Sequence, residues 1–157
     1  MPQAQSSTFA IRDAVEADVD VIVAFTLQEA LEAEHRQLEQ HVVRFGVMAA
    51  FADPPVAHYW LAEDGAGAAV AAVSVVKEWS DFQAGEYWWV QSLYIVPECR
   101  GQGLVEILLD HLTGEARRHG ALDLRLHVHE TNERARRAYS RCGFEVAPYA
   151  IMTRPTK

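Results

Sequence analysis

One stretch of the chain combines an apolar strand, a glycine turn and the start of a helix, an arrangement that can hold a phosphate group. The apolar run 93–96 is ended by Pro97, the turn Arg100–Gly103 follows, and apolar residues recur at helical spacing from Leu104. Glycine lets the backbone approach a ligand closely, and the first N–H groups of a helix carry positive partial charge. The pattern predicts a phosphate or pyrophosphate contact; an ordinary strand–helix connection is the alternative.

Two common phosphate-binding loops do not fit this turn. The nucleoside-triphosphate loop GxxxxGK[ST] needs a lysine, which is missing here. The dinucleotide fingerprint GxGxxG needs a third glycine, where Glu106 stands, and the chain leaves little room for a second mononucleotide-binding half. The ligand of the turn is therefore expected to belong to another class.

A second pattern lies downstream and completes the first. The residues Asn132, Ala135, Tyr139, Gly143 and Phe144 follow the spacing N-x-x-A-x-x-x-Y-x-x-x-G-F. Together with the Arg-x-x-Gly turn, which has the form [Q/R]-x-x-G-x-[G/A], this pattern resembles the paired signatures of the GNAT superfamily of acyl-CoA-dependent N-acyltransferases. The departure is Val105, where the family prefers Gly or Ala; the larger side chain narrows the cradle but keeps its backbone N–H.

The resemblance implies acetyl transfer from acetyl-CoA to a primary amine, by direct attack in a ternary complex. A small cationic amine is the expected acceptor; a protein or peptide amine is one alternative, and a sensor that binds acyl-CoA without turnover is another. Direct attack needs no protein nucleophile, so Cys99 and Cys142 are interpreted as small packing residues.

The resemblance also assigns roles to individual residues. The backbone of the strand would pair with the pantetheine arm, and the amide of Leu93 would contact the thioester oxygen as an oxyanion donor. Tyr139 would act as general acid toward the departing thiolate, with aromatic packing as the alternative. The expected acetyl-CoA contacts are Leu93, Tyr94, Ile95, Arg100, Gly101, Gln102, Gly103, Leu104, Val105, Asn132 and Tyr139.

The general base is not obvious from the sequence. Polyamine-acetylating relatives place a glutamate on the central strand, and the matching position here is Gln91, which cannot accept a proton at neutral pH. The acidic residues Glu78, Asp81 and Glu86 flank that strand, and Glu78 or Glu86 is the expected base. Solvated loop charges are the alternative reading of each.

Aromatic residues beside these acids suggest where an amine would lie. Trp79, Trp88, Trp89 and Tyr94 could wall a cationic pocket through cation–π contacts, although at least two of them are expected to be core residues. The predicted substrate pocket consists of Trp79, Asp81, Trp89 and Gln91.

Two further sets of residues are expected to have structural roles and not functional ones. His127 and His129 share one face of a strand, but no other ligand stands at metal spacing, so no metal site is predicted. Arg137 and Arg141 could approach the ribose phosphate of the cofactor, although solvation on a helix surface is the simpler expectation.

Hydrophobic periodicity predicts an α/β domain with the element order β-α-α-β-β-β-α-β-α-β. The resemblance makes this a mixed, mostly antiparallel central sheet flanked by helices. Residues 1–8 are expected to be a flexible tail and residues 9–157 a single domain. The expected elements are strands at 9–12, 58–62, 69–77, 87–96, 122–128 and 144–152, helices at 17–33, 39–52, 101–119 and 132–142, and a loop at 78–85.

The charge of the chain is uneven along its length. The net charge is −8, but residues 1–99 hold 15 acids and 4 bases (net −11), whereas residues 100–157 hold 7 acids and 10 bases (net +3). An acidic chain does not suit nucleic acid, and no run is long enough to span a membrane. Two cysteines and no visible signal peptide predict a cytoplasmic protein, and a homodimer stays open.

Overall fold

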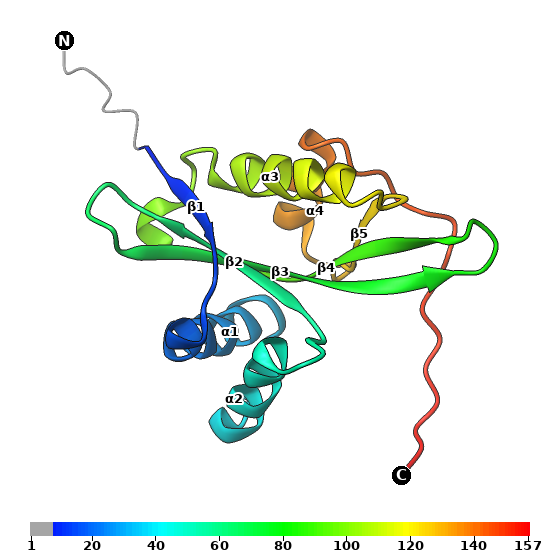
Figure 1. The fold of residues 1–157 in the computed structure, drawn as a ribbon, viewed down its shortest axis with the longest axis horizontal. Helices are drawn as coiled ribbons and strands as arrows, with labels where there is room; N and C mark the ends of the chain where they lie inside the picture. The colour runs from blue at the N-terminus through cyan, green and yellow to red at the C-terminus, as the bar shows by residue number, and fades with distance from the viewer. Residues whose placement is uncertain (1–7) are drawn as a thin grey trace.

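The structure is a computed structural model that describes residues 8–157, in which one sheet lies between two layers of helices (Figure 1). The helices α1 and α2 cover one face, and α3 and α4 cover the other. The tail predicted over residues 1–8 falls, up to residue 7, outside the described residues. Within the described part, no helix is both long and apolar enough to cross a membrane.

The sheet follows the chain order β1-β2-β3-β4-β5. The first four strands pair antiparallel and β5 joins β4 in parallel, which confirms the predicted mixed, mostly antiparallel sheet. The strands are β1 (Ala10–Asp13), β2 (His58–Glu63), β3 (Ala69–Ser80), β4 (Gly85–Ile95) and β5 (Leu124–Leu126).

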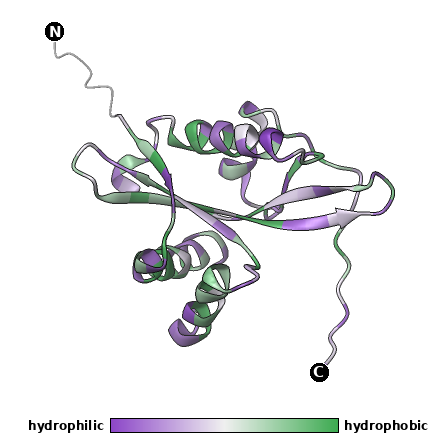
Figure 2. Cartoon of the chain, viewed as in Figure 1, coloured by the Kyte–Doolittle hydropathy of each residue, from purple (hydrophilic) through white to green (hydrophobic). Residues whose placement is uncertain are grey.

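The helices form where the apolar periodicity predicts them. Figure 2 shows α3 with hydrophobic and hydrophilic residues around its circumference, as expected for a helix that buries one face. The α-helices are α1 (Val19–Glu34), α2 (Gln40–Met48), α3 (Leu104–Arg118) and α4 (Glu133–Arg141). Short 3-10 helices lie at Glu16–Asp18, Ala49–Phe51 and Pro97–Cys99.

Two apolar cores lie on the two faces of the sheet because successive side chains of a strand point to opposite sides. In β2, Trp60 and Ala62 pack with Leu108 of α3, whereas Leu61 between them packs with Ile22 of α1. Tyr94 of β4 belongs to the core on the α1 side. The helices α1 and α3 are therefore held against the same central strands from opposite faces.

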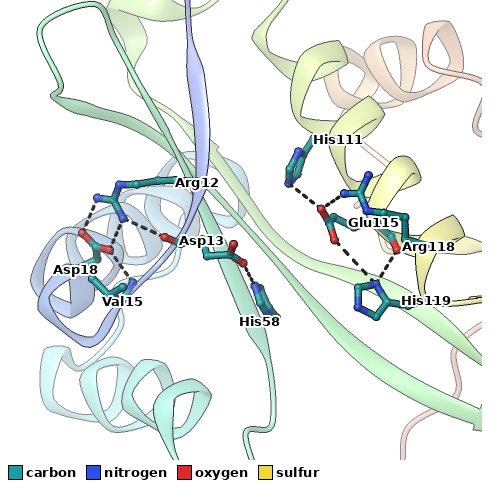
Figure 3. A network of polar contacts seen from close by, with 9 residues as sticks. All are labelled: Arg12, Asp13, Val15, Asp18, His58, His111, Glu115, Arg118 and His119. Carbon is teal, nitrogen blue, oxygen red and sulfur yellow. Dashed lines mark hydrogen bonds and ion pairs between the residues drawn. The ribbon is translucent and has the colours of Figure 1, made fainter.

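The start of α1 is fixed to the sheet by Arg12 of β1. Its guanidinium donates to both carboxylate oxygens of Asp18 at 2.7 and 2.9 Å (Figure 3). It also donates to Glu63 of β2 at 2.6 Å. Asp18 in turn accepts from the backbone N–H of Val15 at 2.8 Å. This anchor joins two strands to the first turn of the helix, so it sets where the later turns of α1 meet the sheet.

The predicted loop at residues 78–85 is wrong, because these residues continue the hairpin of β3 and β4. Trp79 pairs with Glu86 and Ser80 with Gly85, which confines the turn to residues 81–84. This end of the hairpin extends beyond the helices in Figure 1. Glu78 and Trp79 are exposed, so this part of the strand shows no apolar alternation, and its residues were misread as a loop.

The strand predicted at residues 144–152 is also absent from the described residues, although the order of the preceding elements matches. The segment follows α4 as an irregular chain, with Val146 84% and Met152 94% exposed. Pro148 removes one backbone donor from the middle of the run, which weakens any strand there. The apolar residues of this run have the spacing of a strand, but they are exposed and pair with no strand of the sheet.

Three other boundaries differ by a few residues. Helix α3 begins at Leu104 and not at Gly101, because the two glycines of the turn adopt left-handed backbone. Strand β5 keeps only the three residues that pair with β4. Helix α2 ends at Met48 and a short 3-10 helix follows.

Candidate functional site

A cleft of about 660 Å³ opens where β4, α1, the β4–α3 turn and α4 meet. Segments more than 60 residues apart in the sequence contribute to it: Glu29 from α1, Leu93 from β4, Gly103 from the turn and Tyr139 from α4 all line its wall. The cleft therefore joins both sequence patterns with a part of the molecule that neither pattern includes.

The glycine turn presents backbone donors to this cleft. Gly101 and Gly103 have φ angles of 74° and 77°, in the left-handed region that glycine adopts at little cost. A Cβ at Gly101 would meet no atom within 4 Å, so the surface of the turn is open. The first turn of α3 starts at Leu104, and its leading N–H groups have no acceptor within the helix. These features suit a bound phosphate.

Arg100 lies at the edge of the turn and is held by several groups. Its Nε donates to the carbonyl of Ile95 at 2.9 Å, and its terminal nitrogen donates to Glu32 of α1 at 2.6 Å. The guanidinium also lies over the ring of Tyr94, 5.5 Å from the centroid. The Tyr94 hydroxyl donates to the other oxygen of Glu32 at 3.3 Å. Arg100 thus links the turn to α1.

Strand β4 changes its pairing where it enters the cleft. It pairs with β5 only from Trp88 to Val90, and the register against β3 shifts at Gln91, which forms a bulge. Bulges re-aim backbone groups and side chains beside functional sites. Beyond the bulge, the N–H of Leu93 donates to the side chain of Glu29 at 3.1 Å. Past Val90, β4 therefore has no β5 partner on this edge.

Glu29 is a half-buried acid of the cleft. It lies one helical turn after Phe25 and two turns after Ile22, both buried, so the apolar face of α1 carries it toward the sheet. Burial raises its pKa to about 7, the hydrogen bond from Leu93 lowers it in part, and the charge of Glu34 raises it. Near neutral pH this carboxyl group can take up or release a proton.

Tyr139 and Asn132 come from the second pattern. Tyr139 packs edge to face on Phe144, with 6.0 Å between ring centroids. Burial, followed by the negative charge of Glu29, raises the pKa of Tyr139, so the phenol keeps its proton. The side-chain oxygen of Asn132 accepts from the N–H of Ala135 at 3.1 Å and caps α4, which leaves its amide nitrogen as a donor.

The family model for the acetyltransferase (GNAT) family matches residues 22–144 of this chain, most of its length. The chain belongs to the GNAT family. The match spans the turn, the α4 pattern and Glu29 together. The resemblance of the two signatures is thereby confirmed, as is the fold class.

Solved structures agree with this assignment. A possible acetyltransferase from Clostridium difficile 630 has 26% identity and a TM-score of 0.88, with 95% of this chain and 98% of that chain covered. Two other GNAT-like structures share the fold at lower identity. They are an aminoglycoside N-acetyltransferase in complex with CoA (13%, TM-score 0.78, 100% and 99% covered) and a ribosomal-protein-alanine N-acetyltransferase from Brucella melitensis biovar Abortus 2308 (17%, 0.75, 94% and 99%). No curated protein matches the chain.

Most of the residues that the GNAT resemblance implied for acetyl-CoA lie together in the structure. The cleft is lined by Leu93, Tyr94, Ile95, Arg100, Gly101, Gly103, Leu104, Val105, Asn132 and Tyr139. Gln102 is not among its lining residues, and its side chain donates to the carbonyl of Glu98 at 3.0 Å. Arg141 lines the cleft, whereas Arg137 pairs with Glu133 at 3.3 Å outside it.

The expected acceptor residues of the hairpin lie elsewhere. The lining of the GNAT cleft includes Gln91 but not Trp79, Asp81 or Trp89. The indole of Trp89 stacks on His127 with 4.4 Å between centroids. Two of the four predicted wall aromatics, Trp88 and Tyr94, are core residues that are less than 10% exposed.

Neither expected base faces the cleft. Glu78 accepts a hydrogen bond from the indole of Trp89 at 2.6 Å, and Glu86 pairs with Lys77 at 3.7 Å. The sequence analysis did not identify Glu29, although its position in the sequence is unusual. Glu29 occupies a core-facing position in the apolar stripe of α1, where a charged residue is unusual.

The histidine pair of the β5 segment does not form a metal cluster. His129 contacts the hydroxyl of Thr131 at 2.8 Å, while His127 stacks on an indole ring. Across residues 8–157 no group of three His, Cys, Asp or Glu side chains is placed to hold a metal ion.

Proposed function

We propose that this chain is an acetyl-CoA-dependent N-acetyltransferase, carried by one domain over residues 9–157, that acts on the primary amine of a small cation. The observation that supports it most is that one cleft joins the glycine turn, the edge of β4 that β5 leaves free, and Tyr139. These are the parts that a thioester and an amine need: an anion cradle, an oxyanion donor and an acid.

The residues present fit acetyl-CoA at the part of the cleft named here the cofactor end, which is the turn Arg100–Val105 with Arg134 and Arg141 of α4. Two left-handed glycines keep the turn open, and the leading N–H groups of α3 aim positive partial charge at it. When bound, acetyl-CoA supplies an acetyl group activated as a thioester. Asn132, with its free amide nitrogen, would orient the arm of the cofactor.

Two groups would act on the reacting atoms. The N–H of Leu93 would donate to the oxygen that gains negative charge, and its strand is held in place by β3. Tyr139 gives its proton to the departing thiolate; its raised pKa keeps that proton available. The attacking atom is the amine itself. Cys99 lines the cleft, but direct attack requires no thiol.

The acceptor would enter over the part named here the acceptor end, formed by Gln91 of β4 and three carboxylates of α1. Glu29, Glu32 and Glu34 all line the cleft. Three carboxylates so close together attract a cation and disfavour an acidic acceptor. We therefore assign the acidic wall of the acceptor end to α1, and not to the hairpin residues Glu78, Asp81 and Glu86.

Thiol release from acetyl-CoA, measured with the full chain across a panel of amines, tests the proposal. The panel contains a diamine, a polyamine, an amino sugar, and peptides with a free N-terminus or lysine. Fastest release with a small cation supports it, whereas faster release with a peptide overturns the small-amine acceptor. Acetyl-CoA binding measured by calorimetry without release for any amine would instead favour a sensor.

A further inference from the structure

The base that an ammonium acceptor needs is missing from the central strand of this chain, where Gln91 stands. We propose that Glu29 is the general base of the proposed transfer, and that the N–H of Leu93 restrains it until acetyl-CoA takes that donor. The inference rests on the proposed function and deepens it, because it assigns the proton acceptor and couples it to the cofactor.

The position of Glu29 carries the first part of the inference. Glu29 lines the cleft, and within residues 8–157 its carboxylate makes one hydrogen bond, from Leu93 to Oε1, which leaves Oε2 available to accept a proton. Glu29 therefore lies beside the N–H of Leu93, which is expected to contact the thioester oxygen. The amine nitrogen must reach the carbon that carries this oxygen, so it must also approach Glu29. A base has to lie within hydrogen-bond reach of the proton that it removes.

The other two carboxylates of the acceptor end are engaged differently. Glu32 is held by Arg100 at 2.6 Å and by the hydroxyl of Tyr94 at 3.3 Å. Glu34 pairs with Arg36 at 3.3 Å, and its side chain is half exposed. A carboxylate paired with a guanidinium is a poor proton acceptor, so Glu29 is the best-placed base of the acceptor end.

The second part follows from the single donor at Leu93. One N–H cannot donate well to a carboxylate and to a thioester oxygen at the same time. When the acetyl group is in place, Glu29 therefore loses its hydrogen bond. That bond stabilises the ionised form of the carboxyl group, so its loss makes Glu29 a stronger base at the moment when a base is needed.

The titratable groups that face Glu29 do not oppose this rise in its pKa. Its neighbours are Glu34 on α1, Tyr59 on β2 and Tyr139 on α4, and each interacts with it electrostatically. None of them is a cation that would hold the carboxylate ionised. Burial and the charge of Glu34, set against the hydrogen bond from Leu93, put the pKa of Glu29 at about 7 before any ligand binds, close to the pH at which a base works best.

The proton and bond changes balance as follows. The acceptor ammonium gives one proton to Glu29, and the free amine forms the C–N bond as the C–S bond breaks. Tyr139 gives its proton to the thiolate, and the second N–H proton of the new amide returns to the Tyr139 oxygen. Glu29 then releases its proton to water, so one proton leaves for each acetyl group transferred.

Calorimetry tests the coupling without turnover. Titrations of the full chain with acetyl-CoA near pH 7, in buffers of different ionisation enthalpy, report the protons exchanged on binding. We expect uptake of a fraction of a proton, less uptake with CoA, which lacks the thioester oxygen, and none with acetyl-CoA in Glu29→Gln. No uptake by the wild type, or equal uptake by Glu29→Gln, would overturn the coupling.

Kinetics test the base role. Glu29→Gln should lower kcat/KM for the best amine about 100-fold and abolish the loss of rate on the acidic side of the pH profile, with little change in CoA affinity. The control Asp20→Asn changes a carboxylate on the same helix whose side chain is 82% exposed, and should keep both. If Glu29→Gln keeps the wild-type pH profile and rate, the base role is overturned while the proposed function stands. If the wild type acetylates no amine, both fail.

Discussion

The cofactor end and the acceptor end of the cleft differ in whether backbone groups or side chains form them. The cofactor end is mostly backbone: a turn with two left-handed glycines and the first N–H groups of α3. The acceptor end is made of side chains, chiefly the carboxylates of Glu29 and Glu32 on α1. A site formed by backbone groups requires particular residues in a particular order. A site formed by side chains requires only a helix that places a carboxylate at the cleft.

This difference explains why the cofactor end can be recognised from the sequence and the acceptor end cannot. The turn and the α4 pattern each lie within a short segment, so their spacing is visible directly. Glu29 meets Leu93 across 64 positions of the chain, and only the docking of α1 on the sheet brings them together. The following variants separate the two ends, from the largest expected effect to the smallest.

Tyr139→Phe should lower kcat about 100-fold and leave CoA affinity nearly unchanged, because it removes a proton donor and keeps the packing ring on Phe144. Stopped assays of acetyl transfer and calorimetric titration with CoA measure the two quantities. The matched control is Tyr149→Phe, which removes a hydroxyl from a residue that is 82% exposed. Unaltered turnover in Tyr139→Phe would remove Tyr139 from the acid role.

Gly103→Val should weaken CoA binding about tenfold, while the protein stays folded. The φ angle of 77° costs a β-branched residue about 1–2 kcal/mol, so the turn relaxes and its N–H groups move. Gly120→Val is the matched control: it places the same residue at a φ angle of 69°, beyond the other end of α3 and outside the cleft. Equal loss of CoA affinity in both variants would show an effect of strain alone.

The fold was predictable from the sequence where one face of an element is buried. Leu104, Leu108 and Leu112 mark α3 by their spacing, and all three are at most 1% exposed. The errors fall where packing is one-sided or absent. The outer hairpin pairs strands that carry the polar residues Lys77, Glu78 and Ser80, and the segment at 144–152 carries several apolar residues that stay exposed.

The candidate site was predictable only in part, for a related reason. Local spacing identified the turn and Tyr139, but it placed the base on the strand neighbours Glu78 and Glu86, which the structure directs away from the cleft. Glu29 was hidden because helical periodicity was read through apolar residues alone. A charged residue at a buried position of an amphipathic helix is the signal that could have found it.

Glu32→Gln should affect the two ends in opposite directions. It releases Arg100, held at 2.6 Å, to contact the phosphates, and it removes one negative charge from the acceptor end. We expect CoA affinity to rise about two- to fivefold, the range for a partly exposed ion pair, and the KM of a cationic amine to rise similarly. Glu133→Gln removes the same charge from an ion pair on α4 outside the cleft. If Glu32→Gln changes neither constant more than this control does, Arg100 does not link the two ends.

Arg12→Ala should have the smallest effect on the cleft and a measurable effect on the fold. It leaves Asp18, whose side chain is 13% exposed, without its bidentate partner, and it unties β1 and β2 from the first turn of α1. Because Arg12 itself is 39% exposed, we expect a loss of about 1–2 kcal/mol in the free energy of unfolding, measured with urea. Arg36→Ala breaks an ion pair exposed on both sides and should cost less than about 0.5 kcal/mol. This anchor positions the helix that carries Glu29, so Arg12→Ala should lower kcat/KM for the amine while CoA affinity stays constant. If CoA affinity falls by the same factor as kcat/KM, α1 supports the whole cleft and the two ends are not independent.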